Sequence, residues 1–345
     1  MTTLLAGDIG GTKTLLSLYG ADALELLAQE RYISADWVDL APMVRHFLSQ
    51  PEVRAHPRPG AACFAVAGPV HGSQAQLTNL PWQLDEARLA LDCDLERVAL
   101  VNDFAVLIYG LPHLTPPQRA SVRPGEASAG EPVLVLGAGT GLGVAIGLPT
   151  DNGLLAMASE AAHGEFAPRS DAEWQLRQWL LDDLGLQRLS IERIVSGTGL
   201  GHVARWLLDQ EQAASDHPLL AVAGRRRQGE EESGSEGSQT DLPAAVAAAA
   251  AAGDPLASRA LRLWLGAYGS VTGDLALGCL ARGGIWLAGG TAAKQLQGLR
   301  STPFSEAFLA KGRLRSTLEP IPITAILDPA IGSFSAACRA RMLLS

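Results

Sequence analysis

One local pattern occurs twice in this chain and constrains its fold more than any other feature. It consists of an apolar strand, a short loop rich in glycine and threonine, and a second apolar strand. The first copy joins strands at 3–8 and 13–19 through GDIGGT, and the second joins strands at 133–136 and 144–147 through GAGTGLG. Short glycine-rich connections between extended runs favour hairpins. The repeat predicts a duplicated α/β unit, with little sequence identity left between its two copies.

Further strands and helices alternate along the rest of the chain. Short apolar runs closed by glycine, proline or polar residues predict buried strands, and apolar residues at helical spacing predict helices. The alanine-rich run that follows residue 242 also favours helix. We expect strands at 61–67, 98–101 and 285–287, and helices at 36–50, 171–183 and 255–277.

The length of 345 residues is enough for two ordinary domains. Prolines and glycines fill residues 116–132, which we expect to form a loop between the two lobes. We predict a small α/β domain of residues 1–109 plus 325–345 and a large α/β domain of residues 110–324. Residues 224–242 are polar, charged and low in complexity, so we predict a flexible insertion there.

The bulk composition argues against several classes of protein. No apolar run approaches 18 residues, and the first residues lack the basic start and apolar core of a secretion signal. The net charge of −9, with no strong basic patch beyond Arg225, Arg226 and Arg227, argues against a nucleic-acid partner. The four cysteines are far apart and form no CxxC pair, which indicates free thiols in a reducing compartment. We therefore expect a cytoplasmic protein without a membrane partner.

Both glycine loops suit a phosphate group. Backbone N–H groups in a tight glycine turn form a concave anion site, and glycine allows the chain to approach the anion closely. The Walker motif is absent, and GAGTGLG precedes a predicted strand where a dinucleotide-binding motif needs a helix. A third glycine pair, in LAGG, could admit the nucleoside. One such cluster alone equally suits a plain hairpin turn. The predicted cofactor contacts are Gly7, Asp8, Ile9, Gly10, Gly11, Thr12, Gly137, Gly139, Thr140, Gly141, Gly289 and Gly290.

Asp8 is the unusual member of the first glycine loop. A carboxylate beside phosphates would repel them unless a cation lay between, and Mg²⁺ is the usual mediator. We therefore predict that Asp8 helps to place Mg²⁺. The alternative is an aspartate that caps its own turn.

Asn102 and Asp103 directly follow the strand predicted at 98–101. Ligands of α/β folds collect at the carboxyl ends of such strands, and an aspartate there can accept a hydroxyl proton during attack on phosphorus. The alternative is a structural Asx cap on a helix that starts at Phe104.

The stretch SEAAHGEFAP (159–168) contains Glu160, His163 and Glu165 within six residues. Their spacing fits a helix face, a metal site or a polyol site, although no further metal ligand is obvious nearby. His163 alone would equally suit a buried, hydrogen-bonded histidine. Glu192 carries almost no local signal.

Six motifs together resemble a known family. GDIGGT, VNDF, LGAGTGLG, SEAAHGEFAP, ERIVSGTGL and LAGG occur in the order seen in bacterial glucokinases, within the superfamily of actin, heat-shock ATPases and hexokinases. The resemblance runs from Leu4 to about Arg341. It implies two ribonuclease-H-like (actin-like ATPase) α/β domains with a cleft between them. No cysteine-rich zinc motif follows His163, so we expect the branch without zinc.

The resemblance also implies an activity and residue roles. The enzyme would use ATP and Mg²⁺ to phosphorylate D-glucose at its 6-hydroxyl, giving glucose 6-phosphate for glycolysis. Asp103 would be the catalytic base and Asp8 the residue that places the metal. The sugar would be bound by Asn102, Asp103, Glu160, His163 and Glu192, with Asn79 of LTNLPW as a weaker candidate.

This chain departs from the family pattern at a few positions. Many relatives have asparagine where this chain has Lys13, and a glycine pair where it has Ala161 and Ala162. The extra methyl groups could shift sugar affinity without changing the chemistry.

Three other readings remain open from the sequence. A kinase of the same architecture could act on fructose, mannose or N-acetylglucosamine. A non-catalytic sugar sensor is a second reading, although an intact Asp103 favours an enzyme. An actin-like ATPase without a small substrate would have no need of the SEAAH cluster. The sequence also leaves open ADP or polyphosphate as the donor, and a homodimer, which is common among relatives.

Overall fold

The computed structural model describes residues 2–77, 80–211, 216–223 and 241–344. Internal contacts group the chain into two units, while the domain boundaries expected from the sequence stay a prediction. Unit 1 comprises Met1–Gln118, Ala145–Ala158 and Asp328–Ser345, and unit 2 comprises Arg119–Val144 and Ser159–Leu327. The insertion is expected at 224–242, and residues 224–240 of it lie outside the described residues. Leu242, the last residue of the expected insertion, is the first residue of helix α8 (Leu242–Ala251).

Unit 1 contains a five-stranded sheet. Its strands are β1 (Thr3–Ile9), β2 (Lys13–Gly20), β3 (Leu26–Ile33), β4 (Pro59–Val66) and β8 (Val98–Asn102). They lie in the order β3-β2-β1-β4-β8, and β1 and β2 form an antiparallel hairpin, as the sequence predicts. Strand β4 runs parallel to β1, and β8 runs parallel to β4. The register places Ile9, Val66 and Asn102 in one row at the carboxyl edge.

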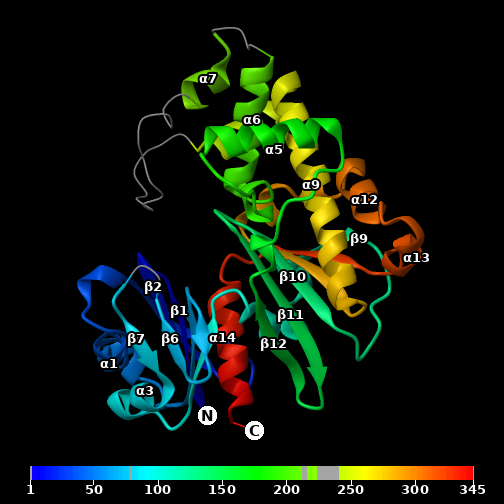
Figure 1. Cartoon of the computed structure of the whole chain (residues 1–345). Helices are drawn as coiled ribbons and strands as arrows, with labels where there is room; N and C mark the ends of the chain where they lie inside the picture. The colour runs from blue at the N-terminus through cyan, green and yellow to red at the C-terminus, as the bar shows by residue number, and fades with distance from the viewer. Residues whose placement is uncertain (1, 78–79, 212–215, 224–240, 345) are drawn as a thin grey trace. The chain divides into compact units, whose positions relative to one another are not determined.

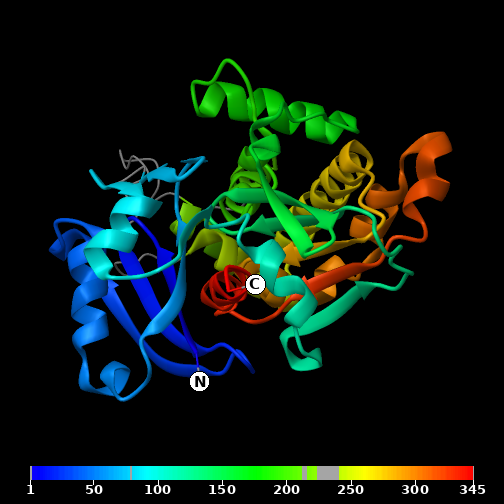
Figure 2. The same ribbon diagram turned by 90° about the horizontal axis from the view of Figure 1, so that it is seen from below.

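Helices cover both faces of this sheet. Helix α1 (Leu40–Ser49) buries Leu40, Val44 and Phe47 in one core cluster with the sheet. The helix expected at 36–50 starts late because Asp39 caps it, with its carboxylate accepting the Leu40 N–H at 2.7 Å. Helix α14 (Ile331–Met342) contacts β1 and β4 on the other face, and Figure 2 shows α1 and α14 on opposite sides of the strands.

The remaining elements of unit 1 are short. Strands β5, β6 and β7 form a small antiparallel sheet. The bounds are η1 (Ser34–Asp36), α2 (Pro51–Arg54), β5 (Val70–His71), β6 (Gln74–Gln76), β7 (Gln83–Asp85), α3 (Glu86–Cys93), α4 (Leu107–Gly110), η2 (Leu111–His113) and η3 (Pro116–Gln118).

A second sheet repeats the strand order of the first. Its strands are β9 (Arg119–Arg123), β10 (Val133–Ala138), β11 (Leu142–Thr150), β12 (Gly153–Ser159), β13 (Gly284–Ala288) and β14 (Ile323–Ile326). The strands lie in the order β12-β11-β10-β13-β14-β9, and β10, β13 and β14 are parallel. The division between the two units falls within β11. A meander followed by two parallel strands thus occurs twice, which confirms the predicted duplication.

Strand β9 corrects the loop expected at 116–132. It pairs antiparallel with β14 at the edge of the second sheet. Only Val122 of its five residues is buried, so the strand lacks the apolar run that signals a buried strand. Backbone pairing to β14 therefore fixes a segment that the side-chain pattern leaves ambiguous.

The helices of unit 2 pack around α9 (Pro255–Cys279). Asp254 caps its start, with its side chain accepting the Ala257 N–H, and Pro255 occupies the first turn. Figure 1 shows α9, in yellow, beside α6 and α12, which contact it. Within the described ranges, no helix is long and apolar enough to cross a membrane. The other bounds are η4 (Ala161–His163), α5 (Asp171–Asp183), η5 (Ile191–Arg193), α6 (Gly197–Gln210), α7 (Pro218–Ala223), α10 (Gly290–Lys294), α11 (Leu296–Leu299), α12 (Thr302–Leu309), η7 (Gly312–Leu314) and α13 (Arg315–Leu318).

Candidate active site

Asn102 caps the turn that follows β8, where the sequence left open a structural cap by Asp103. Its Oδ1 accepts the N–H groups of Phe104 and Ala105 at 3.1 and 3.0 Å. Its Nδ2 donates to Gly68 O at 3.2 Å and to Asp103 Oδ1 at 3.1 Å. Asn102 thus caps the turn through two N–H groups, and its amide also donates to the Asp103 carboxylate.

Asp103 combines an accessible carboxyl with a perturbed pKa. Its backbone N–H donates to Val66 O at 2.9 Å, which fixes the residue beside the end of β4. The side chain reaches the surface, yet the surrounding protein displaces enough water to raise the pKa to about 6. The negative charge of Asp8 raises this pKa further. Hydrogen bonds from the backbone N–H groups of Phe104 and Asp103, and then from the Asn102 side chain, oppose the shift. A carboxyl with a pKa near 6 is mostly ionised at neutral pH and suited to general base catalysis.

Asp8 lies near the carboxyl end of β1, on the sheet face that α14 covers. Its Oδ2 is 3.2 Å from the position that a Cβ on Gly332 would occupy. Burial raises the pKa of Asp8, and the positive charge of Arg31 opposes that shift. Asp8 and Asp103 are close enough for one charge to perturb the other, so a cation beside them would be stabilised.

These donors fit Mg²⁺ as the family implies it. In the described part of the chain, no cluster of three or more histidine, cysteine, aspartate or glutamate side chains could hold a metal ion. Mg²⁺ in phosphoryl-transfer sites commonly takes only one or two carboxylates and completes its shell with water and substrate phosphates. One protein carboxylate, that of Asp8, can therefore serve as the protein ligand of such a Mg²⁺ ion.

The first glycine loop forms a fixed hairpin tip. Gly10 N–H donates to Lys13 O at 3.0 Å. Ser34 holds the tip from outside, because its N–H donates to Thr12 O at 3.0 Å and its Oγ donates to Gly10 O at 2.8 Å. Gly11 is half-buried and Thr12 is exposed. The tip is thus rigid and partly open, as an anion site requires.

Two residues expected at phosphate lie inside the strand. Gly7 is buried, and a Cβ there would lie 2.6 Å from Phe64 Cδ1. The Ile9 side chain belongs to the apolar core of unit 1. Any contact of these two residues with a nucleotide would therefore come from their backbone.

The second glycine loop is a tight turn held by the start of α6. Gly139 N–H donates to Gly141 O at 2.9 Å. The side chain of Ser196 caps α6 by accepting the Gly199 N–H at 2.9 Å. The positive end of this 14-residue helix lies at the turn, because Gly197 N–H donates to Gly139 O at 2.7 Å. A helix N-terminus beside a glycine turn favours a phosphate.

A pocket of about 700 Å³ in unit 2 brings two of the predicted glycine loops together. Apart from the adjoining backbone, no heavy atom of the described residues lies within 4 Å of a Cβ built on Gly139 or on Gly290, so both glycines border open space. Gly289, with φ of +83°, makes the turn that precedes α10. The lining residues are Gly139, Thr140, Gly197, Thr198, Leu200, Val222, Asp241, Leu242, Pro243, Ala244, Ala247, Trp264, Gly290, Thr291, Lys294 and Gln295.

Sequence reasoning missed several of these lining residues. Trp264 forms part of the wall, and its indole N–H donates to Ser196 O at 2.9 Å. Lys294 lies four residues after the LAGG motif. The sequence could have predicted this residue, because a lysine that follows a glycine turn can bind phosphate. Leu242 and Pro243 reach the pocket only through the packing of α8 on α9, which no local pattern reveals.

Three of the residues expected to bind sugar come from two adjoining segments of unit 2. His163 Nε2 lies 3.5 Å from Glu160 Oε2, and both side chains are mainly exposed. Ile191 N–H donates to Gly164 O at 2.9 Å, which joins η4 to η5 and brings Glu192 into this region. The structure therefore groups Glu160, His163 and Glu192, which are up to 32 positions apart in the sequence.

Glu165 has a different role from its neighbours. Its carboxylate pairs with Arg177 at 2.7 Å and with Arg188 at 3.3 Å. The hydrogen bond from Arg177, ahead of that from Arg188, holds the pKa of Glu165 below its usual range. Arg188 also donates to His163 O at 2.6 Å, so this cluster supports the loop.

The candidate residues thus form two groups, one in each unit, and the distances given above lie within a group. Unit 1 carries Asp8, Asn102 and Asp103, and unit 2 carries Glu160, His163, Glu192 and the pocket bordered by Gly139 and Gly290. Asn79 lies outside the described residues.

The family model described as Glucokinase matches residues 5–343. The chain belongs to the glucokinase family. A curated glucokinase of Trichormus variabilis is 40% identical over 347 residues, which cover 99% of this chain and 100% of that protein.

Solved structures show the same fold. A glucokinase from an Antarctic psychrotroph is 26% identical, with a TM-score of 0.80 and 99% of both chains covered. A ROK family glucokinase from Streptomyces griseus in complex with glucose and AMPPNP is 19% identical, with a TM-score of 0.61; 98% of this chain and 99% of that chain are covered. Membership of the glucokinase family and the repeated sheet order confirm the predicted class of two actin-like ATPase-type α/β domains.

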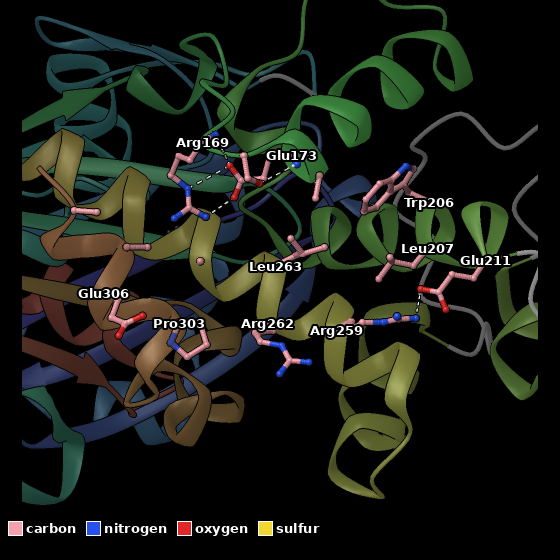
Figure 3. A pocket seen from close by; sticks show the side chains of 15 residues that line it. Arg169, Glu173, Trp206, Leu207, Glu211, Arg259, Arg262, Leu263, Pro303 and Glu306 are labelled. Carbon is pink, nitrogen blue, oxygen red and sulfur yellow. Dashed lines mark hydrogen bonds and ion pairs between the residues drawn. The ribbon is translucent and has the colours of Figure 1, made fainter.

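This member of the glucokinase family has a second pocket in unit 2, of about 690 Å³. Figure 3 shows its wall, where Arg169 pairs with Glu173 and Arg259 with Glu211. It contains none of the glycine-loop residues, and its arginines are largely neutralised by these glutamates. This second pocket therefore offers a phosphate fewer suitable groups than the pocket bordered by Gly139 and Gly290.

Proposed function

We propose that this member of the glucokinase family transfers the γ-phosphoryl group of ATP to the 6-hydroxyl of D-glucose. Asp103 accepts the hydroxyl proton while the sugar oxygen attacks phosphorus, and the bond from phosphorus to the ADP oxygen breaks. The products are ADP and glucose 6-phosphate. The observation that carries this proposal is the accessible carboxylate of Asp103, with a pKa of about 6, at the carboxyl edge of parallel strands.

The proposed nucleotide site uses both glycine loops. The turn at Gly139 and the N-terminus of α6 would face the phosphates, and the apolar wall around Trp264 would cover the nucleoside. Asp8 would hold Mg²⁺, which neutralises phosphate charge and orients the transferred group when bound. The relative whose structure holds glucose and AMPPNP supports ATP as the donor over ADP or polyphosphate.

The proposed sugar site uses exposed, charged hydrogen-bonding groups. Glu160, His163 and Glu192 would bind hydroxyls away from the reacting end, and Asn102 would bind the sugar beside Asp103. Each hydrogen bond to a charged group contributes about 1.5–3 kcal/mol, so several together would select a hexose with matching hydroxyls.

A coupled assay for glucose 6-phosphate tests this function directly. We expect turnover with D-glucose, ATP and Mg²⁺, and turnover lower by about tenfold or more with fructose, mannose or N-acetylglucosamine. Omission of Mg²⁺ with EDTA present should abolish turnover. ATP hydrolysis at an equal rate with and without glucose would contradict the proposal and favour an ATPase without a sugar substrate.

The free cysteines and these substrates also support a cytoplasmic enzyme of glycolysis. Light scattering on the purified protein would decide between a monomer and a homodimer.

A further inference from the structure

The start of α6 and the residues before it hold the second glycine loop at three points. The segment 192–198 runs from η5 into α6 and lies against the turn 139–142. Three hydrogen bonds join the two segments: Leu142 N–H donates to Glu192 Oε2 at 2.8 Å, Gly197 N–H to Gly139 O at 2.7 Å, and Thr198 Oγ1 to Thr140 O at 2.9 Å.

The contact with Glu192 also explains a glycine. A Cβ built on Gly141 would lie 2.3 Å from Glu192 Oε2, and all three nearest atoms belong to that glutamate. Gly141 does not have a positive φ. A side chain at this position would therefore displace the carboxylate, whereas the backbone conformation alone does not demand glycine.

We propose that Glu192 is a positioning residue for the nucleotide loop in addition to its expected contact with sugar. Its carboxylate fixes Leu142, and the same turn presents Gly139 and Thr140 to the nucleotide pocket. Within the described part of the chain, the bond from Leu142 is the hydrogen bond recorded for this carboxylate, and it uses Oε2. Oε1 is then available to a sugar hydroxyl.

This arrangement couples the two substrates. A hydroxyl bound to Oε1 orders the carboxylate, and an ordered carboxylate holds the turn in the shape that binds phosphate. Coupling between two binding sites is reciprocal, so glucose should tighten nucleotide binding by the factor by which nucleotide tightens glucose binding. The coupling rests on the proposed function, whereas the support of the turn by Glu192 does not.

Calorimetry with Mg²⁺ and AMPPNP in the absence of sugar tests the inference. Glu192→Ala removes the acceptor and should weaken AMPPNP binding by about tenfold. Glu192→Gln retains an oxygen that can accept from Leu142, so its AMPPNP affinity should stay within about threefold of the unchanged protein. Gly141→Ala displaces the carboxylate by a different route and should resemble Glu192→Ala.

The double variant decides whether the two changes act through one contact. If they do, Glu192→Ala combined with Gly141→Ala should bind AMPPNP as weakly as either single variant. Full additivity of the two losses would overturn the inference. So would unchanged AMPPNP affinity in Glu192→Ala. If Glu192→Ala fails to fold, as judged by circular dichroism, Gly141→Ala and Glu192→Gln still give opposite expectations.

Glu160→Ala is the matched control. Glu160 is also expected at the sugar, but its recorded contact is with His163 and it has none with the turn. Its sugar-free AMPPNP affinity should therefore equal that of the unchanged protein. Repeating the titrations with saturating glucose should strengthen AMPPNP binding about fivefold or more in the unchanged protein and less in Glu192→Gln. If glucose has no effect on any variant, the coupling fails while the support of the turn stands, and the coupled assay for glucose 6-phosphate still decides the proposed function.

Discussion

We expect Asp103, as the proposed base, to set the acid limb of the pH–rate profile. A carboxyl with the ordinary pKa of 3.8 would be mostly ionised at every pH from 5 to 8. A pKa of about 6 places the titration of Asp103 within this pH range. The base works only when ionised, so kcat/KM for glucose should fall as the pH drops through 6. The ionised fraction is roughly 90% at pH 7 and roughly 10% at pH 5, which predicts a loss of about an order of magnitude between them.

The cause of the shift gives a second, independent test. Burial contributes most and the charge of Asp8 contributes next. Asp8→Asn removes that charge, so the acid limb should move to lower pH even though the variant is expected to be slower overall. The assay is initial-rate kinetics with coupled detection of glucose 6-phosphate from pH 5 to 8 at constant ionic strength.

Titration of ATP itself must be separated from that of the protein. Carbon NMR of ligand-free protein, with Asp103→Asn to assign the signal, reports the carboxyl directly. A midpoint near 4 in both the NMR titration and the kinetic profile would refute the argument. An acid limb near pH 6 that stays at the same pH in Asp8→Asn would refute the contribution of the Asp8 charge to the pKa of Asp103.

Three further results are expected. Gly290→Val should raise KM for ATP by tenfold or more without loss of folding, because the valine side chain would enter open space in the proposed nucleotide pocket. Arg262→Ala, in the other pocket, is the control and should leave KM for ATP unchanged. Equal effects of the two changes on KM would contradict the choice of pocket. Ser196→Ala should lower the free energy of unfolding by about 1 kcal/mol in urea titrations, because it removes the cap of α6; an unchanged midpoint would contradict this. Glucose should reduce the radius of gyration in solution scattering, because the proposed sugar residues come from both units; an unchanged radius would count against a sugar bound by both.

The sequence predicts the strands and their glycine loops well because those signals are local. An apolar run that ends in glycine and aspartate describes β1 and its hairpin without reference to any distant residue. Asn102 and Asp103 are found for the same reason, since they directly follow β8. The sequence left open whether Asp103 is a structural cap, and only side-chain geometry shows Asn102 in that role.

The parts that the sequence missed depend on packing between distant segments. Trp264 enters the nucleotide pocket because α9 packs beside α6, and β9 is a strand because β14 pairs with it. Glu165 looks like a member of the sugar cluster until its partners Arg177 and Arg188 are seen. The contact of Glu192 with the glycine turn spans 50 residues of sequence, so no local pattern reports it.

The central claim is that Asp103 removes the proton from the 6-hydroxyl of glucose. Asp103→Asn retains the size and the backbone bond to Val66, and an amide cannot act as the base. Single-turnover formation of glucose 6-phosphate, measured beside glucose affinity and with exposed Asp22→Asn as control, separates chemistry from binding. We predict a rate lowered by about 10² or more with glucose affinity within about tenfold, and unchanged values for the control. A normal single-turnover rate in Asp103→Asn would contradict the account.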